Sequence, residues 1–228
     1  MRKHLLLLLA FAAVIPAASA AVEPVILVES VSPEPVAPGG TARVHVLLRN
    51  AGETAATFDA LSVETPPGVT VTGIRGIDGR VSLCGGCQLT GTVHLAVADD
   101  VVSGTYPVAL TLKRNGIGVV ETVDLAVDGD PHLLVDVANT SVVPGRTVTT
   151  TVSVTNIGTA TAAQVTVSPA HDRIAFRPGT VALGTVAPGE TATATVGITA
   201  DASLASGVQR LPVTLTYRSD ATERTVTR

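Results

Sequence analysis

Alternating apolar and polar residues run through most of the chain, in short stretches separated by turn-forming residues. In residues 41–50, apolar side chains occupy every second position, and residues 193–198 show the same period. A period of two places alternate side chains on opposite faces of a β-strand, whereas an amphipathic helix needs apolar residues three to four apart. The pattern therefore predicts an all-β protein whose strands each bury one face.

The second half of the chain repeats the order of turn and strand signals of the first half. Three pairs of segments keep their order and spacing: 38–52 with 144–158, 81–83 with 181–183, and 103–112 with 206–217. Each copy has room for about seven short strands, which close naturally as a Greek-key sandwich. We predict two tandem immunoglobulin-like β-sandwiches, residues 21–129 and 130–228, joined at a short polar turn.

The first twenty residues have the features of a secretory signal peptide. A basic start, which includes Arg2 and Lys3, precedes an apolar run over residues 5–15 and a small-residue segment that ends at Ala20. The run is shorter than the ~20 residues that span a bilayer as a helix. We predict cleavage after Ala20, a secreted or cell-surface location, and no transmembrane helix in the mature chain.

The composition excludes several classes of function. The net charge is −4, and no run of Lys or Arg exists to neutralise phosphates, so nucleic acid is not an expected partner. Only 2% of the residues are aromatic and Trp is absent, which disfavours a stacking platform for sugars. The sequence contains no nucleophile-elbow, zinc-protease or phosphate-loop motif. We expect no catalytic residue, no cofactor and no enzyme activity.

Cys84-Gly85-Gly86-Cys87 is the motif whose side chains are chemically the most reactive in this sequence. Two glycines at the centre of a tight turn bring the flanking residues close enough for a disulfide, and export permits such a bond to persist. Intermolecular or reactive thiols are a second reading, and a metal or redox site is a third. A metal site normally needs a second ligand pair, and a redox pair normally starts a helix. We predict a structural disulfide between Cys84 and Cys87.

The remaining potential ligands do not form a recognisable set. The five histidines lack ligand spacing, and His45 and His94 fall on the outward phase of predicted strands. Acidic pairs at 99–100 and 128–130 lie in turns where calcium could bind, but neither pair supplies the six or more oxygens that the ion prefers. No metal site is predicted, and calcium binding is left open.

Several segments of the second copy resemble a known class of surface domains. They are residues 152–160 (VSVTNIGTA), 176–179 (FRPG), 183–184 (LG) and 188–191 (PGET). They are similar to the Ig-like repeats of archaeal S-layer-like proteins and to the related bacterial cell-adhesion-related and "NPCBM-associated" modules. The shared motifs are turn signals, so the resemblance implies a fold and a surface location more than an activity.

Export, repetition and the lack of a catalytic motif together favour a non-catalytic structural or adhesion module of the cell envelope. Its expected partners are proteins or other envelope components, including further copies of the chain that pair through exposed edge strands. Two alternatives remain open at this point. One is an extracytoplasmic accessory subunit of a transport or export system, and the other is a ligand-binding module associated with a surface enzyme.

Overall fold

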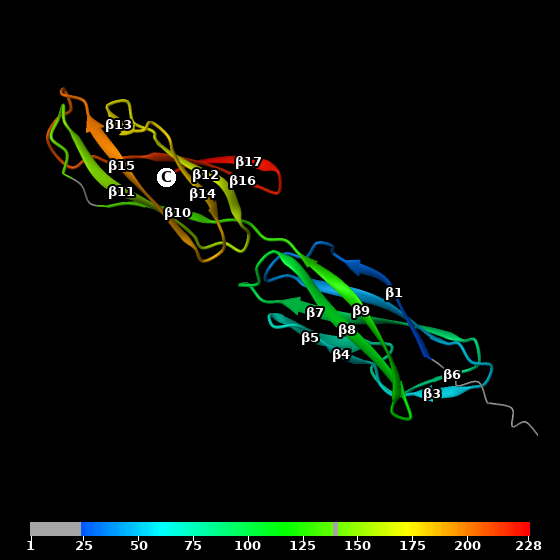
Figure 1. Ribbon diagram of the computed structural model, residues 1–228. Helices are drawn as coiled ribbons and strands as arrows, with labels where there is room; N and C mark the ends of the chain where they lie inside the picture. Colours follow the sequence, from blue (N-terminus) through cyan, green and yellow to red (C-terminus); the bar gives the residue numbers. More distant parts are fainter. Residues whose placement is uncertain (1–23, 139–140) are drawn as a thin grey trace, which may run out of the picture.

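The computed structural model describes residues 24–138 and 141–228, and all the regular elements in these ranges are β-strands (Figure 1). The strands of residues 24–129, called here the N-terminal half, are β1 (Pro24–Ser32), β2 (Thr41–Asn50), β3 (Ala56–Phe58), β4 (Ser62–Glu64), β5 (Val69–Arg75), β6 (Val81–Leu83), β7 (Gln88–Val97), β8 (Gly104–Arg114) and β9 (Ile117–Val127). Those of residues 130–228, the C-terminal half, are β10 (Leu133–Val137), β11 (Thr147–Asn156), β12 (Ala162–Pro169), β13 (Ile174–Arg177), β14 (Val181–Val186), β15 (Thr191–Ala200), β16 (Val213–Ser219) and β17 (Thr222–Thr227). The all-β prediction is confirmed, whereas the signal peptide predicted for residues 1–20 lies outside the described residues.

The two halves use the same strand order. One sheet of the N-terminal half has the order β1-β2-β7-β5, and its counterpart in the C-terminal half has the order β10-β11-β15-β13. The opposite layer is β14-β12-β16-β17 in the C-terminal half. In the N-terminal half that layer is split, with β4-β8-β9 forming one sheet and β3-β6 another. All of these strand pairs are antiparallel.

Each half has its own cluster of buried apolar side chains. The N-terminal cluster joins Val44 of β2 to Leu110 of β8, and the C-terminal cluster joins Val154 of β11 to Leu215 of β16. Each cluster thus draws on both layers of its half, and the two layers therefore pack face to face as a sandwich. Removing these aliphatic side chains from water supplies most of the stabilising free energy, at roughly 25 cal/mol per Å² of apolar surface.

The alternation seen in the sequence decides which face of each strand is buried. Along β2, Ala42 and Val44 are buried, whereas Arg43 between them is exposed. On the outer faces, threonine hydroxyls pair across strands, as between Thr155 and Thr191 at 2.8 Å. A shift of one residue in register would turn the apolar face to water, so burial specifies the register.

The halves lie end to end, and the chain passes once between them (Figure 1). The domain limits at 21–129 and 130–228 stay a prediction.

Candidate functional site

A buried asparagine holds together the loops at the outer end of the N-terminal half. The side chain of Asn50 is fully buried, and its Nδ2 donates to the carbonyls of Thr54 at 2.8 Å, Leu83 at 3.0 Å and Cys84 at 3.1 Å. Its Oδ1 accepts from the Gly52 N–H at 3.0 Å. Because buried polar groups need partners, this residue joins the loop after β2 to the end of β6 and the turn that follows it, and it has no free atom for a ligand.

Asn156 has the same role in the C-terminal half. It is also fully buried, and its Nδ2 donates to the carbonyls of Ala160 at 2.7 Å and Val186 at 3.1 Å. Its Oδ1 accepts from the N–H groups of Gly158 at 3.0 Å and His132 at 3.1 Å. The Asn-x-Gly segments, interpreted from the sequence as turn signals, are therefore also polar anchors inside the protein.

The glycine-rich turn between β6 and β7 contains both cysteines. Cys84 and Cys87 are joined by a disulfide with their Cα atoms 5.2 Å apart. The Cys87 N–H donates to the Cys84 carbonyl at 3.1 Å, and Gly86 has a φ of 74°, a conformation that favours glycine. At Gly85, a Cβ would overlap the backbone of Glu53. Both glycines are thus needed for the shape of this turn, and its location between two strands provides no helix N-terminus to activate a thiol.

The corresponding turn of the C-terminal half is residues 187–190. Gly189 donates to the Asn156 carbonyl at 2.8 Å, as Gly86 donates to the Asn50 carbonyl at 3.0 Å. Strand pairing matches Leu83 with Val186, because they pair with Ala56 and Ala162 at the same ends of β3 and β12. The sequence alignment of 81–83 with 181–183 is therefore wrong by three residues at this point. The reason is that β14 is longer than β6 and pairs with β12 through irregular register steps.

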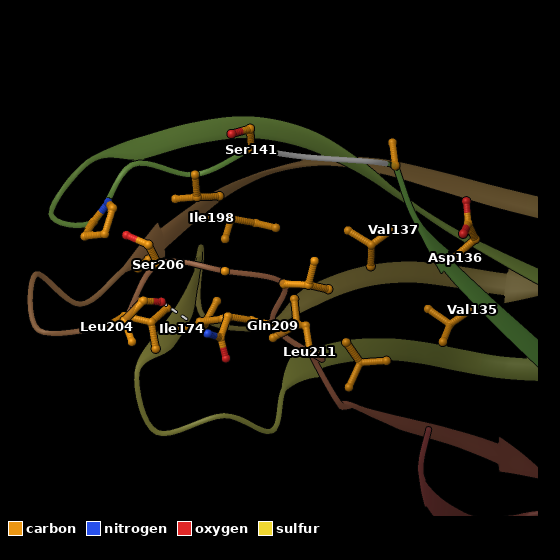
Figure 2. A pocket seen from close by; sticks show the side chains of 18 of the residues that line it. Val135, Asp136, Val137, Ser141, Ile174, Ile198, Leu204, Ser206, Gln209 and Leu211 are labelled. Carbon is orange, nitrogen blue, oxygen red and sulfur yellow. Dashed lines mark hydrogen bonds between the residues drawn. The ribbon is translucent and has the colours of Figure 1, made fainter.

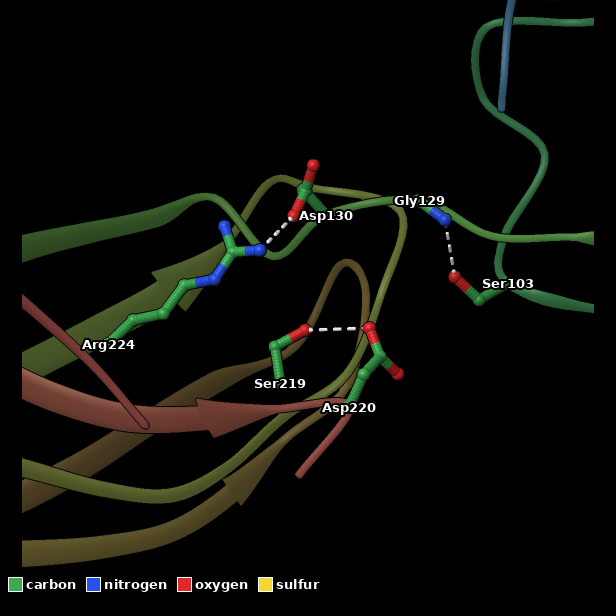
Figure 3. Close-up of polar contacts among 6 residues, drawn as sticks. All are labelled: Ser103, Gly129, Asp130, Ser219, Asp220 and Arg224. Carbon is green, nitrogen blue, oxygen red and sulfur yellow. Dashed lines mark hydrogen bonds and ion pairs between the residues drawn. The ribbon is translucent and has the colours of Figure 1, made fainter. Parts of the chain in front are cut away.

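One backbone hydrogen bond crosses the junction between the halves, and a second hydrogen bond and an ion pair lie beside it within the separate halves. Ser103 N–H donates to the Thr159 carbonyl at 2.8 Å, and Gly129 N–H donates to the Ser103 Oγ at 2.9 Å. Figure 3 shows the second of these bonds beside the ion pair between Asp130 and Arg224, 2.9 Å apart. Because this ion pair is largely exposed, it contributes at most about 1 kcal/mol.

The acidic turns at the junction do not converge on a common point. Asp99 and Asp100 border a hollow of about 420 Å³ whose other wall includes residues 157–159. Asp130 is engaged by Arg224. Within residues 24–138 and 141–228, no group of three or more His, Cys, Asp or Glu side chains lies close enough to hold a metal ion. The Nδ1 atom of His45 lies 3.4 Å from the hydroxyl oxygen of Thr92.

A larger groove lies in the C-terminal half, and Figure 2 shows the side chains that line it. Its volume is about 780 Å³. The walls are mainly aliphatic and include Val135, Val137, Ile174, Ile198, Leu204 and Leu211. Sequence analysis missed this groove, because no residue motif accompanies a gap between strands.

Unpaired sheet edges form another candidate surface. β9 pairs with β8 on one side, and on the other side of β9 the described residues provide only a single bridge, between Val36 and Val127. Ile117 is 79% exposed and Val120 is 60% exposed on this edge strand. Exposed backbone groups beside apolar side chains are the usual requirement for adding a further strand.

Comparisons with known proteins give one family match and several weak structural similarities. No curated protein matches the chain. A protein of unknown function from Porphyromonas gingivalis W83 shares 14% identity over 87% of this chain and 96% of its own, with a TM-score of 0.31. Red sea bream transglutaminase shares 14% identity over 89% of this chain and 30% of its own, with a TM-score of 0.33.

A third structure is the cupredoxin domain of amoB from Nitrosocaldus yellowstonii, with 15% identity and a TM-score of 0.31. That match covers 40% of this chain and 57% of the solved one, so the chain spans little more than half of that domain.

In the described ranges, no helix is long and apolar enough to cross a membrane. Residues 123–225 match the CARDB family model, an Ig-like, cell-adhesion-related type of domain, which agrees with the β-sandwich seen there.

Proposed function

We propose that this protein is a non-catalytic structural or adhesion module of the cell envelope, in which two tandem Ig-like sandwiches act as a spacer that contacts protein partners. The match of residues 123–225 to an adhesion-related domain is the observation that supports this proposal most. S-layer-like assembly is the more specific form of the same proposal. It draws on the turn motifs of the C-terminal half and on the open sheet edges.

The proposal includes export and maturation. The signal peptide is removed after Ala20, and the mature chain is secreted or held at the cell surface. In that oxidising location, the Cys84–Cys87 disulfide forms and persists as a structural bond. Partners bind without metal or cofactor, through backbone groups and apolar side chains on strand edges such as β9.

In the first experiment, the full chain is expressed in its native cells. The cells are then fractionated, and the N-terminus of the product is sequenced. We expect a mature protein that begins at Ala21 and that is accessible to protease on intact cells or present in the medium. Ala18→Arg combined with Ala20→Arg is the matched control, because it removes the small residues needed for cleavage. A cytosolic product that begins at Met1 would contradict export.

A second experiment tests the partner. The mature protein is cross-linked on intact cells, recovered and analysed for bound envelope proteins, while light scattering reports the mass of the purified protein. We expect specific envelope proteins or further copies of the chain in the cross-linked product. A monomer in the medium that cross-links to nothing would refute an assembly role, and recovery with transporter subunits would favour the accessory-subunit alternative.

A further inference from the structure

Strand pairing gathers basic side chains on the outer face of the sheet β1-β2-β7-β5, although the N-terminal half is acidic overall. Residues 24–129 contain 11 Asp and Glu residues and 6 Lys and Arg residues. Three of those six basic residues, together with both histidines of this half, occupy outward positions of the sheet. The five residues are Arg43, His45 and Arg49 of β2, Arg75 of β5 and His94 of β7.

The strand register places four of these side chains around one threonine. Arg43 lies directly opposite His94. Thr92 lies opposite His45 on one side and opposite Arg75 on the other. The residues that alternate with them along each strand contact the buried core, so these side chains share the outer face. Neighbouring positions are about 5 Å apart across strands and about 7 Å apart along a strand. The four basic residues around Thr92 are called here the basic cluster.

The basic cluster is accessible, and its charges are not neutralised by acidic side chains. Arg43 and Arg75 are exposed, and within the described residues neither makes an ion pair. The acidic residue of this sheet is Glu29, which lies in the bulge of β1 and makes no ion pair with them. Gly73 pairs with His94, and a Cβ at Gly73 would meet nothing within 4 Å. The space beside the cluster is therefore open to a ligand.

The C-terminal half shows that the fold does not require these basic residues. Its sheet β10-β11-β15-β13 has the same strand order as β1-β2-β7-β5. Counted back from the buried asparagine that ends each strand, Thr149 of β11 corresponds to Arg43 of β2. In the same way, Thr151 corresponds to His45. The same sheet thus forms with uncharged residues at these positions, so folding does not explain the basic cluster.

The arrangement of the cluster favours a polymer that carries repeated anionic groups. Exposed guanidinium groups bind carboxylate, sulfate and phosphate oxygens through charge-assisted hydrogen bonds. An open sheet face gives one small anion few contacts, whereas a polyanion contacts several cations at once and releases their counterions. The centre of a protein interface is usually rich in large apolar side chains, but Thr92 and Gly73 lie at the centre here. The outward positions of β2, β5 and β7 carry no Phe, Tyr or Trp on which nucleic acid bases could stack.

We propose that the basic cluster binds an anionic polysaccharide of the cell envelope, a sugar polymer with carboxylate, sulfate or phosphate groups. Arg43 and Arg75 contact the anionic groups of the polymer. The rings of His45 and His94 and the Thr92 hydroxyl form hydrogen bonds with sugar hydroxyls between them. The contact retains the chain at the cell surface through charge. This inference rests on the proposed function, in which the chain is exported to the envelope.

The test measures binding of defined polymers to the full mature protein by titration calorimetry at low ionic strength. The probes are polygalacturonate, which carries carboxylates, dextran sulfate, which carries sulfate esters, and neutral dextran. We expect binding of at least one anionic polymer, no binding of neutral dextran, and an affinity that falls as salt is added. Which of the two anionic polymers binds more tightly identifies the anionic group. Binding of neither would overturn the proposal, and binding of polyglutamate alone would replace the polysaccharide with an acidic protein.

Substitutions in the cluster separate this site from the overall charge of the protein. Arg43→Thr combined with Arg75→Thr is expected to lower the affinity at least about tenfold. The slope of log affinity against log salt should fall by about two, because each lost contact removes about one. Arg146→Thr combined with Arg210→Thr is the matched control, since both residues are exposed and the net charge changes equally. The control is expected to keep the affinity within about twofold, because distant charges are screened. Equal losses in the two variants would overturn the assignment of the site.

Mapping on the unaltered protein gives a readout that does not depend on how a variant folds. A short oligomer of the polymer that binds is added, and backbone amide shifts are followed by NMR. We expect the largest shifts at Arg43, Arg75 and Thr92, and none at Val120 and Asp124 on the outer face of the opposite layer. Largest shifts elsewhere would overturn the proposal. These results are independent of the fractionation and cross-linking experiments, so a failure of export or of protein partners would refute the proposed function without changing polymer binding in vitro.

Discussion

Cys87 and Glu190 occupy the same position in equivalent turns, and each closes its turn with its side chain. Cys87 does so through the disulfide to Cys84. Glu190 does so by accepting a hydrogen bond from the Ala187 N–H on its Oε2, at 3.0 Å. In both turns the backbone N–H of this residue also donates to the carbonyl of the residue three positions earlier, at 3.1 Å for Cys87 and 3.0 Å for Glu190. Two different chemistries thus support one backbone shape.

The disulfide is expected to add only modest stability. It closes a loop between positions three residues apart, whereas a fifteen-residue loop is worth about 3 kcal/mol in the chain-entropy model. Cys84→Ser combined with Cys87→Ser is therefore expected to lower the free energy of unfolding by less than ~3 kcal/mol, measured by urea denaturation. Reductant should destabilise the native protein similarly and leave the double variant unchanged. Loss of folding in the double variant would contradict this prediction.

Removal of the Glu190 carboxylate is expected to have a smaller effect. Glu190→Ala leaves the Ala187 N–H without its side-chain acceptor, but water can replace the carboxylate because Glu190 is exposed. We expect a loss of about 0.5–1.5 kcal/mol in the free energy of unfolding. Glu223→Ala, at an exposed position of β17, is the control and should change stability by less than about 0.5 kcal/mol. Equal effects of the two changes would show that the turn bond contributes nothing.

The buried asparagines are expected to be much more sensitive. Asn156→Asp keeps the side-chain shape but removes the two bonds donated by Nδ2 to Ala160 and Val186. Burial also raises the pKa of the new carboxyl group, so the variant loses further stability as the pH rises above about 4, the ordinary Asp value. We expect a loss of about 3 kcal/mol or more near pH 7, measured by urea denaturation at several pH values. A loss below about 1 kcal/mol that does not vary with pH would refute this.

The sequence predicted the strands well because burial itself imposes the period of two. Val44 and Val154 were placed on inward faces by alternation alone, and both are fully buried. The asparagines were interpreted only as turn signals, since nothing in an Asn-x-Gly segment shows whether its side chain points inward. Burial of Asn50 depends on carbonyls such as that of Leu83, which lies thirty-three residues away along the chain.

Two other features could not be predicted from the sequence pattern, each for a different reason. The alignment of Leu83 with Leu183 was wrong because both Leu183 and Val186 fit an apolar position, and only the strand pairing distinguishes them. The groove beside Val142 was missed because its aliphatic lining comes from segments far apart in the sequence, such as those of Val135 and Leu211.

The carboxyl group of Asp201 provides a prediction about pH. Hydrogen bonds from the side chain and backbone of Ser203 hold the pKa of Asp201 below its ordinary value. A lowered pKa in the folded state means that the contribution to stability is present above the unfolded value and is lost as the pH falls through the folded value. Ser203→Ala is expected to raise the pKa of Asp201, measured by carbon NMR of its carboxyl group. Ser206→Ala, in the same loop, is the control and should leave this titration unchanged.

The junction depends on the absence of a side chain at Gly129. A Cβ there would overlap the Thr159 side chain and approach Pro38 at 3.1 Å, so it would press directly between the two halves. We expect Gly129→Ala to change the mean angle between the halves, measured by residual dipolar couplings and small-angle scattering, with both cores intact. Gly79→Ala, where a Cβ meets nothing within 4 Å, is the matched control. Unchanged couplings in Gly129→Ala would mean that the close contact of residue 129 with Thr159 does not set the orientation of the halves.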